Sequence, residues 1–387
     1  MKIAMLGHKR IPSREGGVEI VVEALAERMV AAGHHVTVYN RKGKHVSGED
    51  VFSSKKRYEY KGIQIVTVPT FEKKSLNAIV YAFFATLKAS FSKAEVLHFH
   101  AEGPCAMLPI AKIFRKRCVA TIHGLDWQRA KWGGFATRFL KFGEKMAAKH
   151  ADEVIVLSKG VQEYFRSTYN RETVLIPNGI ERPEIRKPEL IEKEYGLKGQ
   201  DYILFLARLV PEKAAHTLME AYQKSGVKIP LVVAGGSSHS DEYEEEIKTL
   251  CKNINDNPDT KGKIIMTGFV QGQKIQELYS NCLCYVLPSE IEGMPLSLLE
   301  AMSYGKLCIT SDISENTDVT GGYGMSFPVG DVEKLSQLLK QIEEQGAGLY
   351  DTAQYKPEII ADSVLERFSW NDVVERTVNI YESVNGK

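Results

Sequence analysis

Residues 284–302 read CYVLPSEIEGMPLSLLEAM, in which an apolar strand runs through a short turn into a helix. The strand Cys284–Leu287 is apolar at every position, which is typical of a strand buried on both faces of a parallel sheet. The turn carries Glu292, and Glu300 lies within the helix that follows. Strand, turn and helix in this order form the repeating unit of a doubly wound α/β fold.

The same unit recurs on both sides of this stretch. The first part of the chain predicts strands at residues 3–6, 35–39, 63–68, 96–99, 118–122 and 154–157. The second part predicts strands at residues 202–207, 231–234, 264–267, 284–287 and 307–310. Turn-forming residues begin at Pro177 and continue with charges to Pro188, so we place a domain boundary after residue 178. We therefore expect two Rossmann-like, doubly wound domains, residues 1–178 and 179–370, that face each other across a cleft.

Composition excludes several classes of protein. The 387 residues include 50 Lys and Arg against 49 Asp and Glu, a net charge of +1 that argues against a nucleic-acid-coating protein and an acidic disordered chain. Six cysteines are thinly spread, and the first residues, MKIAML, lack the pattern of a signal peptide. No apolar run approaches the ~20 residues that span a bilayer. A soluble or peripheral protein of the reducing cytoplasm is expected.

The strongest chemical signal is the pair Glu292 and Glu300. A carboxylate can accept two sugar hydroxyls at once. Gly293 allows close approach to the backbone, and the turn at residues 294–296 opens a helix whose first amides can receive phosphate oxygens. The structural alternative is a loop residue at Glu292 and a helix-surface charge at Glu300.

Two cations follow an earlier strand of the second domain. Arg208 and Lys213 come directly after residues 202–207, at the strand end where ligands bind in open α/β folds. Arg forks onto two oxygens and Lys acts as a point charge, so together they match a pyrophosphate. Solvated loop charges are the alternative, which the glutamate pair after a later strand weakens.

The first domain carries two weaker signals. Gly16 and Gly17 precede a helix and allow a ligand to approach its amides, although the G-x-G-x-x-G fingerprint is missing and a tight turn alone explains them. Residues 121–132 combine an imidazole, a carboxylate, two cations and two tryptophans, which suits sugar recognition. A structural role for the single imidazole, His123, is the alternative.

A zinc site is a further alternative for the first domain. His98 and His100 alternate on one strand, and His123 follows the next strand. No metal-binding spacing such as H-E-x-x-H supports this interpretation, so we expect no metal.

Taken together, these residues resemble the retaining glycosyltransferases of family 4, which have the GT-B fold of two Rossmann-like domains. The resemblance covers essentially the whole chain. Its motifs are Gly16-Gly17-Val-Glu19, His98-Phe-His100, His123-Gly, Ile176-Pro-Asn-Gly179, Ala207-Arg-Leu-Val-Pro-Glu-Lys213, Ala234-Gly-Gly236, Thr267-Gly-Phe-Val270, Glu292 with Glu300, Gly321-Gly-Tyr-Gly324 and Pro328-Val-Gly-Asp331. Residues 7–17 and 123–132 look like a narrower subgroup of capsule and exopolysaccharide enzymes that includes rhamnosyltransferases.

The resemblance implies a role for each matching residue. Arg208 and Lys213 would hold the donor diphosphate, Glu300 the ribose or deoxyribose, and Glu292 the transferred sugar. His123 would lie beside that sugar. Further donor contacts would come from Gly16, Gly17, Gly293, Met294, Pro295 and Leu296. The acceptor would meet Arg14, Asp126, Trp127, Arg129 and Trp132. The last segment, residues 371–387, would pack back on the first domain.

The expected reaction is transfer of a sugar from a nucleotide-sugar to a saccharide or lipid-linked saccharide acceptor, with retention at the anomeric carbon, in surface polysaccharide synthesis. The subgroup favours dTDP-rhamnose as donor, with UDP-hexoses next. No cofactor and no obligatory metal are expected, since no D-x-D motif is placed to bring Mg²⁺ to the diphosphate. Basic stretches at residues 8–10, 55–57 and 115–117, beside Ile79–Phe84, suggest peripheral contact with the inner face of the cytoplasmic membrane.

Three alternative functions remain open. A sugar-nucleotide 2-epimerase has the same fold, and a non-catalytic nucleotide-sugar-binding protein would share the donor residues. A dehydrogenase is disfavoured because the dinucleotide fingerprint is missing.

Overall fold

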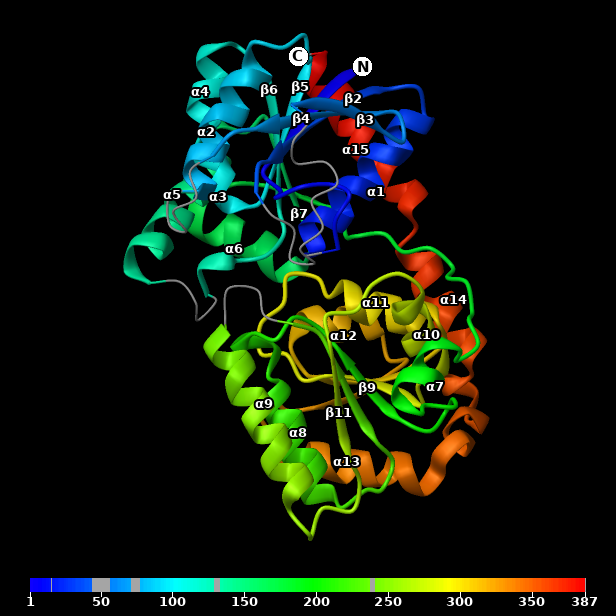
Figure 1. The fold of residues 1–387 in the computed structure, drawn as a ribbon. Helices are drawn as coiled ribbons and strands as arrows, with labels where there is room; N and C mark the ends of the chain where they lie inside the picture. Colours follow the sequence, from blue (N-terminus) through cyan, green and yellow to red (C-terminus); the bar gives the residue numbers. More distant parts are fainter. Residues whose placement is uncertain (15, 44–55, 71–76, 129–132, 237–240, 387) are drawn as a thin grey trace. The chain divides into compact units, whose positions relative to one another are not determined.

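The computed structural model describes the chain except for residues 15, 44–55, 71–76, 129–132, 237–240 and 387. The chain divides into two compact units, each a sheet covered by helices on both faces (Figure 1). Unit 1 comprises Met1–Gly179 together with Trp370–Lys387, and unit 2 comprises Ile180–Ser369.

The sheet of unit 1 has eight strands in the order β3-β4-β2-β1-β5-β6-β7-β8. Their bounds are β1 (Lys2–Leu6), β2 (His35–Arg41), β3 (Arg57–Tyr60), β4 (Ile63–Val68), β5 (Val96–His100), β6 (Arg117–Ile122), β7 (Glu153–Val156) and β8 (Val174–Leu175). All neighbours are parallel except β3 and β4. The chain runs first to one side of β1 and then to the other, so a topological switch point lies between β1 and β5.

Helices cover both faces of this sheet. Their bounds are α1 (Gly17–Ala31), α2 (Asn77–Ser90), α3 (Glu102–Cys105), α4 (Leu108–Ile113), α5 (Gly134–His150), α6 (Lys159–Tyr169) and α15 (Trp370–Asn385). Helices α1 and α15 pack together on one face, and α2 to α5 pack on the other (Figure 1). Gly179 sits against Trp370, because a Cβ at this position would lie 2.4 Å from the indole ring. Helix α15 is therefore part of unit 1, which begins with β1.

Unit 2 contains a six-stranded parallel sheet in the order β11-β10-β9-β12-β13-β14. Its strands are β9 (Ile203–Leu206), β10 (Leu231–Ala234), β11 (Ile264–Gly268), β12 (Cys284–Leu287), β13 (Leu307–Ser311) and β14 (Met325–Phe327). Its helices are α7 (Leu190–Tyr195), α8 (Ala215–Ser225), α9 (Asp241–Asp256), α10 (Gln273–Asn281), α11 (Leu296–Ser303), α12 (Ser314–Thr320), α13 (Val332–Gln345) and α14 (Pro357–Arg367). The switch point of this sheet lies between β9 and β12.

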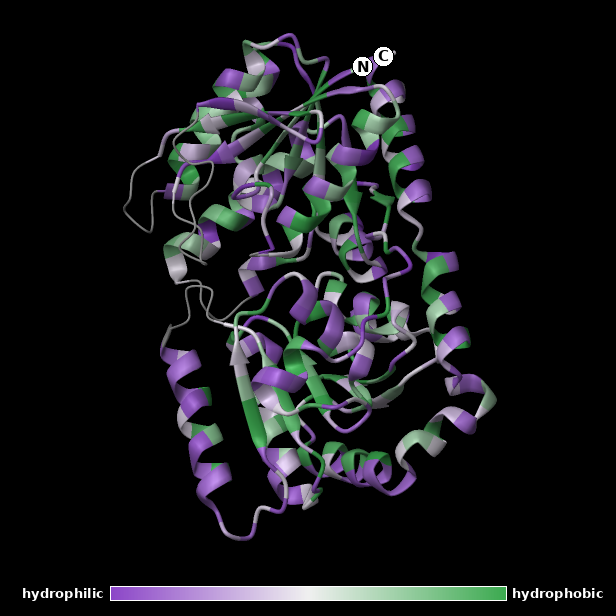
Figure 2. Cartoon of the chain, turned by 45° about the vertical axis from the view of Figure 1, so that its right-hand side comes forward, coloured by the Kyte–Doolittle hydropathy of each residue, from purple (hydrophilic) through white to green (hydrophobic). Residues whose placement is uncertain are grey.

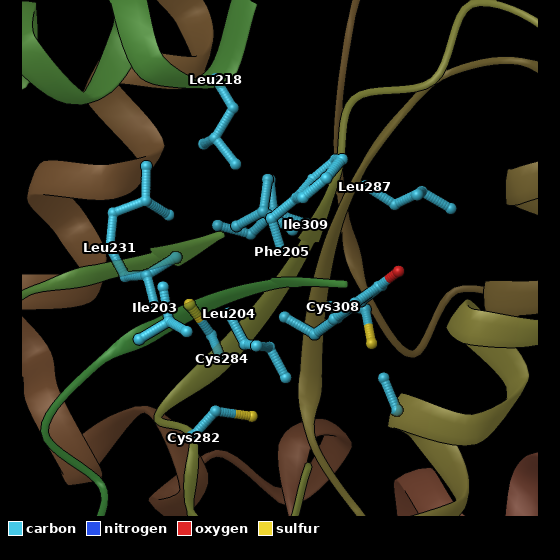
Figure 3. Packing of buried hydrophobic residues seen from close by; sticks show 14 of the residues in the cluster. Ile203, Leu204, Phe205, Leu218, Leu231, Cys282, Cys284, Leu287, Cys308 and Ile309 are labelled. Carbon is cyan, nitrogen blue, oxygen red and sulfur yellow. The ribbon is translucent and has the colours of Figure 1, made fainter. Parts of the chain in front are cut away.

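The core of unit 2 forms where the apolar strands meet their covering helices. Side chains of β9, β10, β12 and β13 lie close together with Leu218 of α8 (Figure 3). Cys282, Cys284 and Cys308 are part of this core, where burial raises the pKa of the Cys282 thiol to about 11. All six cysteines of the chain are buried free thiols.

Hydropathy follows the same layering. Figure 2 shows hydrophobic colours along the strands, while the helices alternate between hydrophobic and hydrophilic residues. Within the described part of the chain, none of the helices combines the length and the apolar character that a bilayer crossing requires.

Candidate functional site

The donor-side residues of unit 2 gather at its switch point. Arg208 lies two residues beyond the end of β9, and Lys213 ends the 3₁₀ turn Pro211–Lys213. Glu292 follows β12, which is the strand next to β9 in the sheet. Because adjacent parallel strands end at the same edge, these loops meet where an α/β sheet binds ligands.

An ion pair joins the two loops. The ammonium of Lys213 contacts Oε1 of Glu292, and the two side chains are only 12% and 7% exposed. A backbone hydrogen bond from the amide of Glu290 to the carbonyl oxygen of Glu212, 2.9 Å long, ties the same loops together. The two loops thus hold a shielded pair of opposite charges in place.

Glu300 is placed by tyrosines of the core. The hydroxyl of Tyr279 shares its one proton between two acceptors, Oε2 of Glu300 at 3.3 Å and the carbonyl oxygen of Ser297 at 3.2 Å. Tyr285 donates to the hydroxyl of Ser297 at 2.8 Å. Burial raises the pKa of Tyr285, and the nearby carboxylates of Glu292 and Glu300 add to the shift. Both glutamates therefore lie around one buried tyrosine.

The turn between Glu292 and α11 holds the remaining donor residues. Gly293 and Pro295 are buried, whereas Met294 and Leu296 are partly exposed, and α11 begins at Leu296. Pro295 has no N–H group and cannot donate to a phosphate. Amide donors in this turn can come only from the other three residues.

In unit 1, His123 follows β6 and meets a histidine of β5. Nδ1 of His100 lies 3.1 Å from Nε2 of His123, so one ring donates and the other accepts. The ring of His98 lies 4.1 Å from the ring of His100. Burial, together with mutual repulsion among the rings, lowers the pKa of His98 to about 3 and that of His100 well below its usual value. Both strand histidines are therefore neutral at pH 7.

The ring nitrogens of His98 already have partners. Nδ1 lies 2.6 Å from the hydroxyl of Tyr381 on α15, and Nε2 lies 2.7 Å from the hydroxyl of Thr121 on β6. A ring engaged in this way has no lone pair for a zinc ion. The described residues contain no group of three or more potential ligands arranged around a metal position.

Asp126 and Trp127 lie in the 3₁₀ turn Asp126–Gln128 that follows His123. The indole N–H of Trp127 donates to Oε2 of Glu144 at 3.0 Å, and the ammonium of Lys141 lies 4.0 Å from the ring centroid. Trp127 is thus anchored to α5 on its polar edge. Arg14 is exposed ahead of α1, and Arg129 and Trp132 lie outside the described residues.

Two buried glutamates beneath this turn are absent from the sequence-based prediction. Glu144 accepts hydrogen bonds from Trp127 and also from Tyr164 at 2.8 Å and Tyr169 at 2.5 Å. Glu102, at the start of α3, is fully buried; its burial, with the negative charge of Asp126 and the contact with Glu144, raises its pKa far above the usual value. The signal for Glu144 was available, since it shares one helical face with apolar residues at positions 140 and 147.

At the start of α1, the glycines have a structural explanation. The buried carboxylate of Glu19 accepts a hydrogen bond of 2.8 Å from the amide of Lys9. A Cβ on Gly16 would lie 2.5 Å from the other oxygen of Glu19, so a larger residue would displace this carboxylate, which gives Gly16 a structural explanation without any ligand. Gly17 is the first helical residue and is exposed.

The structure therefore brings the candidate residues together as two groups. In unit 2, Lys213 contacts Glu292, Arg208 follows β9, and Glu300 lies in α11, the helix that follows β12. In unit 1, His123, Asp126 and Trp127 follow β6, and Gly16 and Gly17 follow β1.

Comparison with known proteins matches both units. Residues 15–182 match the family described as Glycosyltransferase Family 4, and residues 187–357 match the family described as Glycosyl transferases group 1. A sucrose-phosphate synthase structure from Thermosynechococcus elongatus superposes with a TM-score of 0.80 at 21% identity, covering 99% of this chain and 98% of that chain. This likeness identifies the fold as GT-B.

Two curated relatives are similar to this chain in sequence. An uncharacterised glycosyltransferase of Methanocaldococcus jannaschii is 26% identical and covers 99% of this chain and 98% of its own length. The UDP-Gal:alpha-D-GlcNAc-diphosphoundecaprenol alpha-1,3-galactosyltransferase of Escherichia coli is 29% identical, covering 65% of this chain and 67% of its own length.

Proposed function

Because the chain is a family 4-like glycosyltransferase with the GT-B fold, we propose that it transfers a sugar from a nucleotide-sugar donor to an acceptor hydroxyl with retention at the anomeric carbon. The observation that carries this proposal is the shielded pair of Lys213 and Glu292 at the switch point of unit 2. One partner suits a phosphate oxygen and the other suits a sugar hydroxyl, so the pair matches the junction between the diphosphate and the sugar.

Arg208 and Lys213 would stabilise the charge on the departing diphosphate, together with the amides at Gly293, Met294 and Leu296. Preorganised positive groups at the place where charge develops are the main source of such stabilisation. Glu300 would accept hydrogen bonds from the ribose or deoxyribose. No metal or cofactor is part of this proposal.

The proposed attack occurs on the face of the sugar from which the diphosphate leaves. The bond between the anomeric carbon and the diphosphate oxygen breaks first, and the diphosphate keeps the electron pair. The acceptor oxygen then bonds to the anomeric carbon, and its proton passes to the departing phosphate oxygen. Nε2 of His123 is engaged with His100, so His123 would hydrogen-bond the sugar through Nδ1.

For the donor we propose dTDP-rhamnose, with UDP-hexoses as the next choice, and for the acceptor a saccharide, either free or linked to a lipid diphosphate. The Escherichia coli galactosyltransferase supports the general pattern, because its name includes a UDP-sugar donor and a diphosphoundecaprenol-linked acceptor. We place this reaction in surface polysaccharide synthesis at the cytoplasmic side of the membrane.

A thermal-shift panel tests the donor. The panel contains dTDP-rhamnose, UDP-glucose, UDP-galactose and UDP-N-acetylglucosamine, and a donor at 100 times its Kd stabilises the protein by about 2.7 kcal/mol. The double variant Lys213→Met/Glu292→Gln should lose most of the shift. Absence of a shift with every nucleotide-sugar would contradict the proposal.

Incubation with the nucleotide-sugar that gives a thermal shift distinguishes the alternative functions. A 2-epimerase converts the donor alone to an epimerised nucleotide-sugar. A non-catalytic binding protein shows the thermal shift but releases no nucleoside diphosphate with any acceptor. A transferase releases nucleoside diphosphate in proportion to the glycosylated product.

A further inference from the structure

Helix α5 of unit 1 exposes an unusual combination of side chains. Phe135 and Phe142 are 71% and 49% exposed, although large apolar side chains are normally buried. Four cations are exposed on the same helix. We call these six residues the α5 surface: Phe135, Arg138, Lys141, Phe142, Lys145 and Lys149.

The spacing gathers these residues on one side of the helix. Positions 135, 138, 142, 145 and 149 are separated by three or four residues and so form one stripe along a helix. The opposite side packs into unit 1 through Leu140, Gly143 and Ala147. The only acidic residue of α5, Glu144, lies on this buried side. The outward side therefore carries four positive charges and no negative charge.

These properties decide what could cover the surface. Exposed cations with no acidic residue on the same face of α5 select an anionic occupant, and two exposed rings about 10 Å apart along the helix select one with an apolar interior. A helix with cations beside phenylalanines lies in the boundary between headgroups and acyl chains of an anionic bilayer.

The segments that first suggested membrane contact are less suitable. Tyr81, within Ile79–Phe84, is buried and donates a hydrogen bond of 2.5 Å to the carbonyl oxygen of Tyr39. Lys116 donates to the carbonyl oxygens of Ser92 and Ala94 at 2.9 and 2.8 Å. His8 is buried against Asn40, and Lys55 lies outside the described residues. These residues serve largely to hold unit 1 together.

We propose that the α5 surface docks unit 1 on an anionic phospholipid bilayer. The inner side of the same helix holds Trp127 through Glu144, and Lys141 lies over the indole ring. Docking of α5 would bring the turn Asp126–Gln128 to the lipid headgroups, where a lipid-linked acceptor presents its diphosphate and sugar. This last step rests on the proposed function, whereas lipid binding itself does not.

Co-sedimentation with vesicles tests the docking surface without any enzymatic assay. The vesicles contain either phosphatidylcholine alone or phosphatidylcholine with 30 mol% phosphatidylglycerol. We expect the wild-type protein to sediment only with the second kind and to be released by 0.5 M NaCl. Replacement of both rings, Phe135→Ser/Phe142→Ser, should weaken binding at least tenfold. The variant Arg138→Gln/Lys145→Gln/Lys149→Gln should weaken it about 100-fold.

Two matched control variants lie in unit 2. The control Lys252→Gln/Lys334→Gln/Lys340→Gln removes the same charge from exposed positions, and Ile359→Ser removes one exposed apolar side chain. Both should bind like the wild type, and circular dichroism should show all variants folded. Wild-type protein that does not bind phosphatidylglycerol vesicles, or α5 variants that bind like the controls, would overturn the proposal. A dimer that only the α5 variants disrupt, without vesicle binding, would assign the surface to a second copy of the chain.

The result does not depend on catalysis. Normal vesicle binding by a protein that transfers no sugar would reject the proposed function and retain the docking surface. Sugar transfer to a water-soluble acceptor by a protein that does not bind vesicles would reject the docking surface and retain the proposed function.

Discussion

Nδ1 of His100 and Nε2 of His123 lie 3.1 Å apart, which ties the loop after β6 to the fully buried strand β5. This contact holds the orientation of the His123 ring. Among the residues that the structure describes, the other ring nitrogen of His100 has no hydrogen-bond partner and is buried. We infer that His100 acts through its contact with His123, as a positioning residue.

The first prediction concerns this contact. His100→Leu removes it, and we expect kcat to fall about 10- to 100-fold with a smaller change in the KM for the donor, because a displaced group mainly affects the transition state. The double variant His100→Leu/His123→Ala should be no slower than His123→Ala alone, since the first residue acts through the second. Tyr381→Phe, which alters only His98, is the control. Additive losses in the double variant would contradict the positioning role.

The second prediction separates stability from activity at the ion pair of unit 2. Lys213→Ala leaves the Glu292 carboxylate shielded and uncompensated, so we expect a loss of about 3–5 kcal/mol in the free energy of unfolding. The variant Lys213→Met/Glu292→Gln removes both charges at similar volume and should regain most of this stability while remaining inactive. Urea unfolding and nucleoside diphosphate release measure the two effects. Transfer at the wild-type rate by the double variant would exclude both residues from the donor site.

The third prediction is a pH dependence of the stability of unit 1. Glu102 stays protonated in the folded state because burial and the neighbouring acids raise its pKa, whereas the unfolded chain releases this proton above about pH 4.5. Its stabilising contribution is thus complete at low pH and is lost as pH rises. Between pH 5 and 8, the free energy of unfolding of the wild type should fall relative to Glu102→Gln by up to about 1.4 kcal/mol per pH unit. If the free energies of unfolding of the wild type and of Glu102→Gln changed in parallel with pH, the protonation of Glu102 in the folded state would be refuted.

The fourth prediction tests the close approach of two loops beside Arg208. A Cβ on Gly235, whose φ is +147°, would lie 1.8 Å from the carbonyl oxygen of Ala207. Gly235→Ala should therefore displace Arg208 and raise the KM for the donor at least tenfold. The neighbouring Gly236→Ala meets its nearest atom, Cβ of Phe269, at 3.5 Å and should change the KM less than threefold. Equal changes in the KM for the donor from the two substitutions would show that donor binding does not need the close approach of Gly235 to Ala207.

Most strands could be predicted because their residues are largely apolar or β-branched. Residues 63–68, 231–234 and 284–287 match β4, β10 and β12 at both ends. Strands β3, β8 and β14 were missed. Strand β3 is a polar edge strand with no fully buried residue, while β8 and β14 are only two and three residues long. Such edges are defined by pairing with a neighbour, which a single sequence does not display.

The candidate site was predictable in part for a related reason. The strand-to-loop positions of Arg208, Lys213 and Glu292 follow from the sequence, but their meeting depends on β12 lying next to β9, which is a property of strand order. Glu144 was missed because a charged residue on a helix is normally solvated, and its three hydrogen-bond donors come from other segments.

The hydrogen bond between His98 and Tyr381 spans 283 positions of the chain. During synthesis on the ribosome, β5 emerges long before α15, so the core of unit 1 is completed only after α15 has emerged. Unit 2 is continuous from Ile180 to Ser369 and can fold while the ribosome is still adding α15. We therefore expect a nascent chain truncated before Trp370 to contain a finished second unit and an incomplete first one.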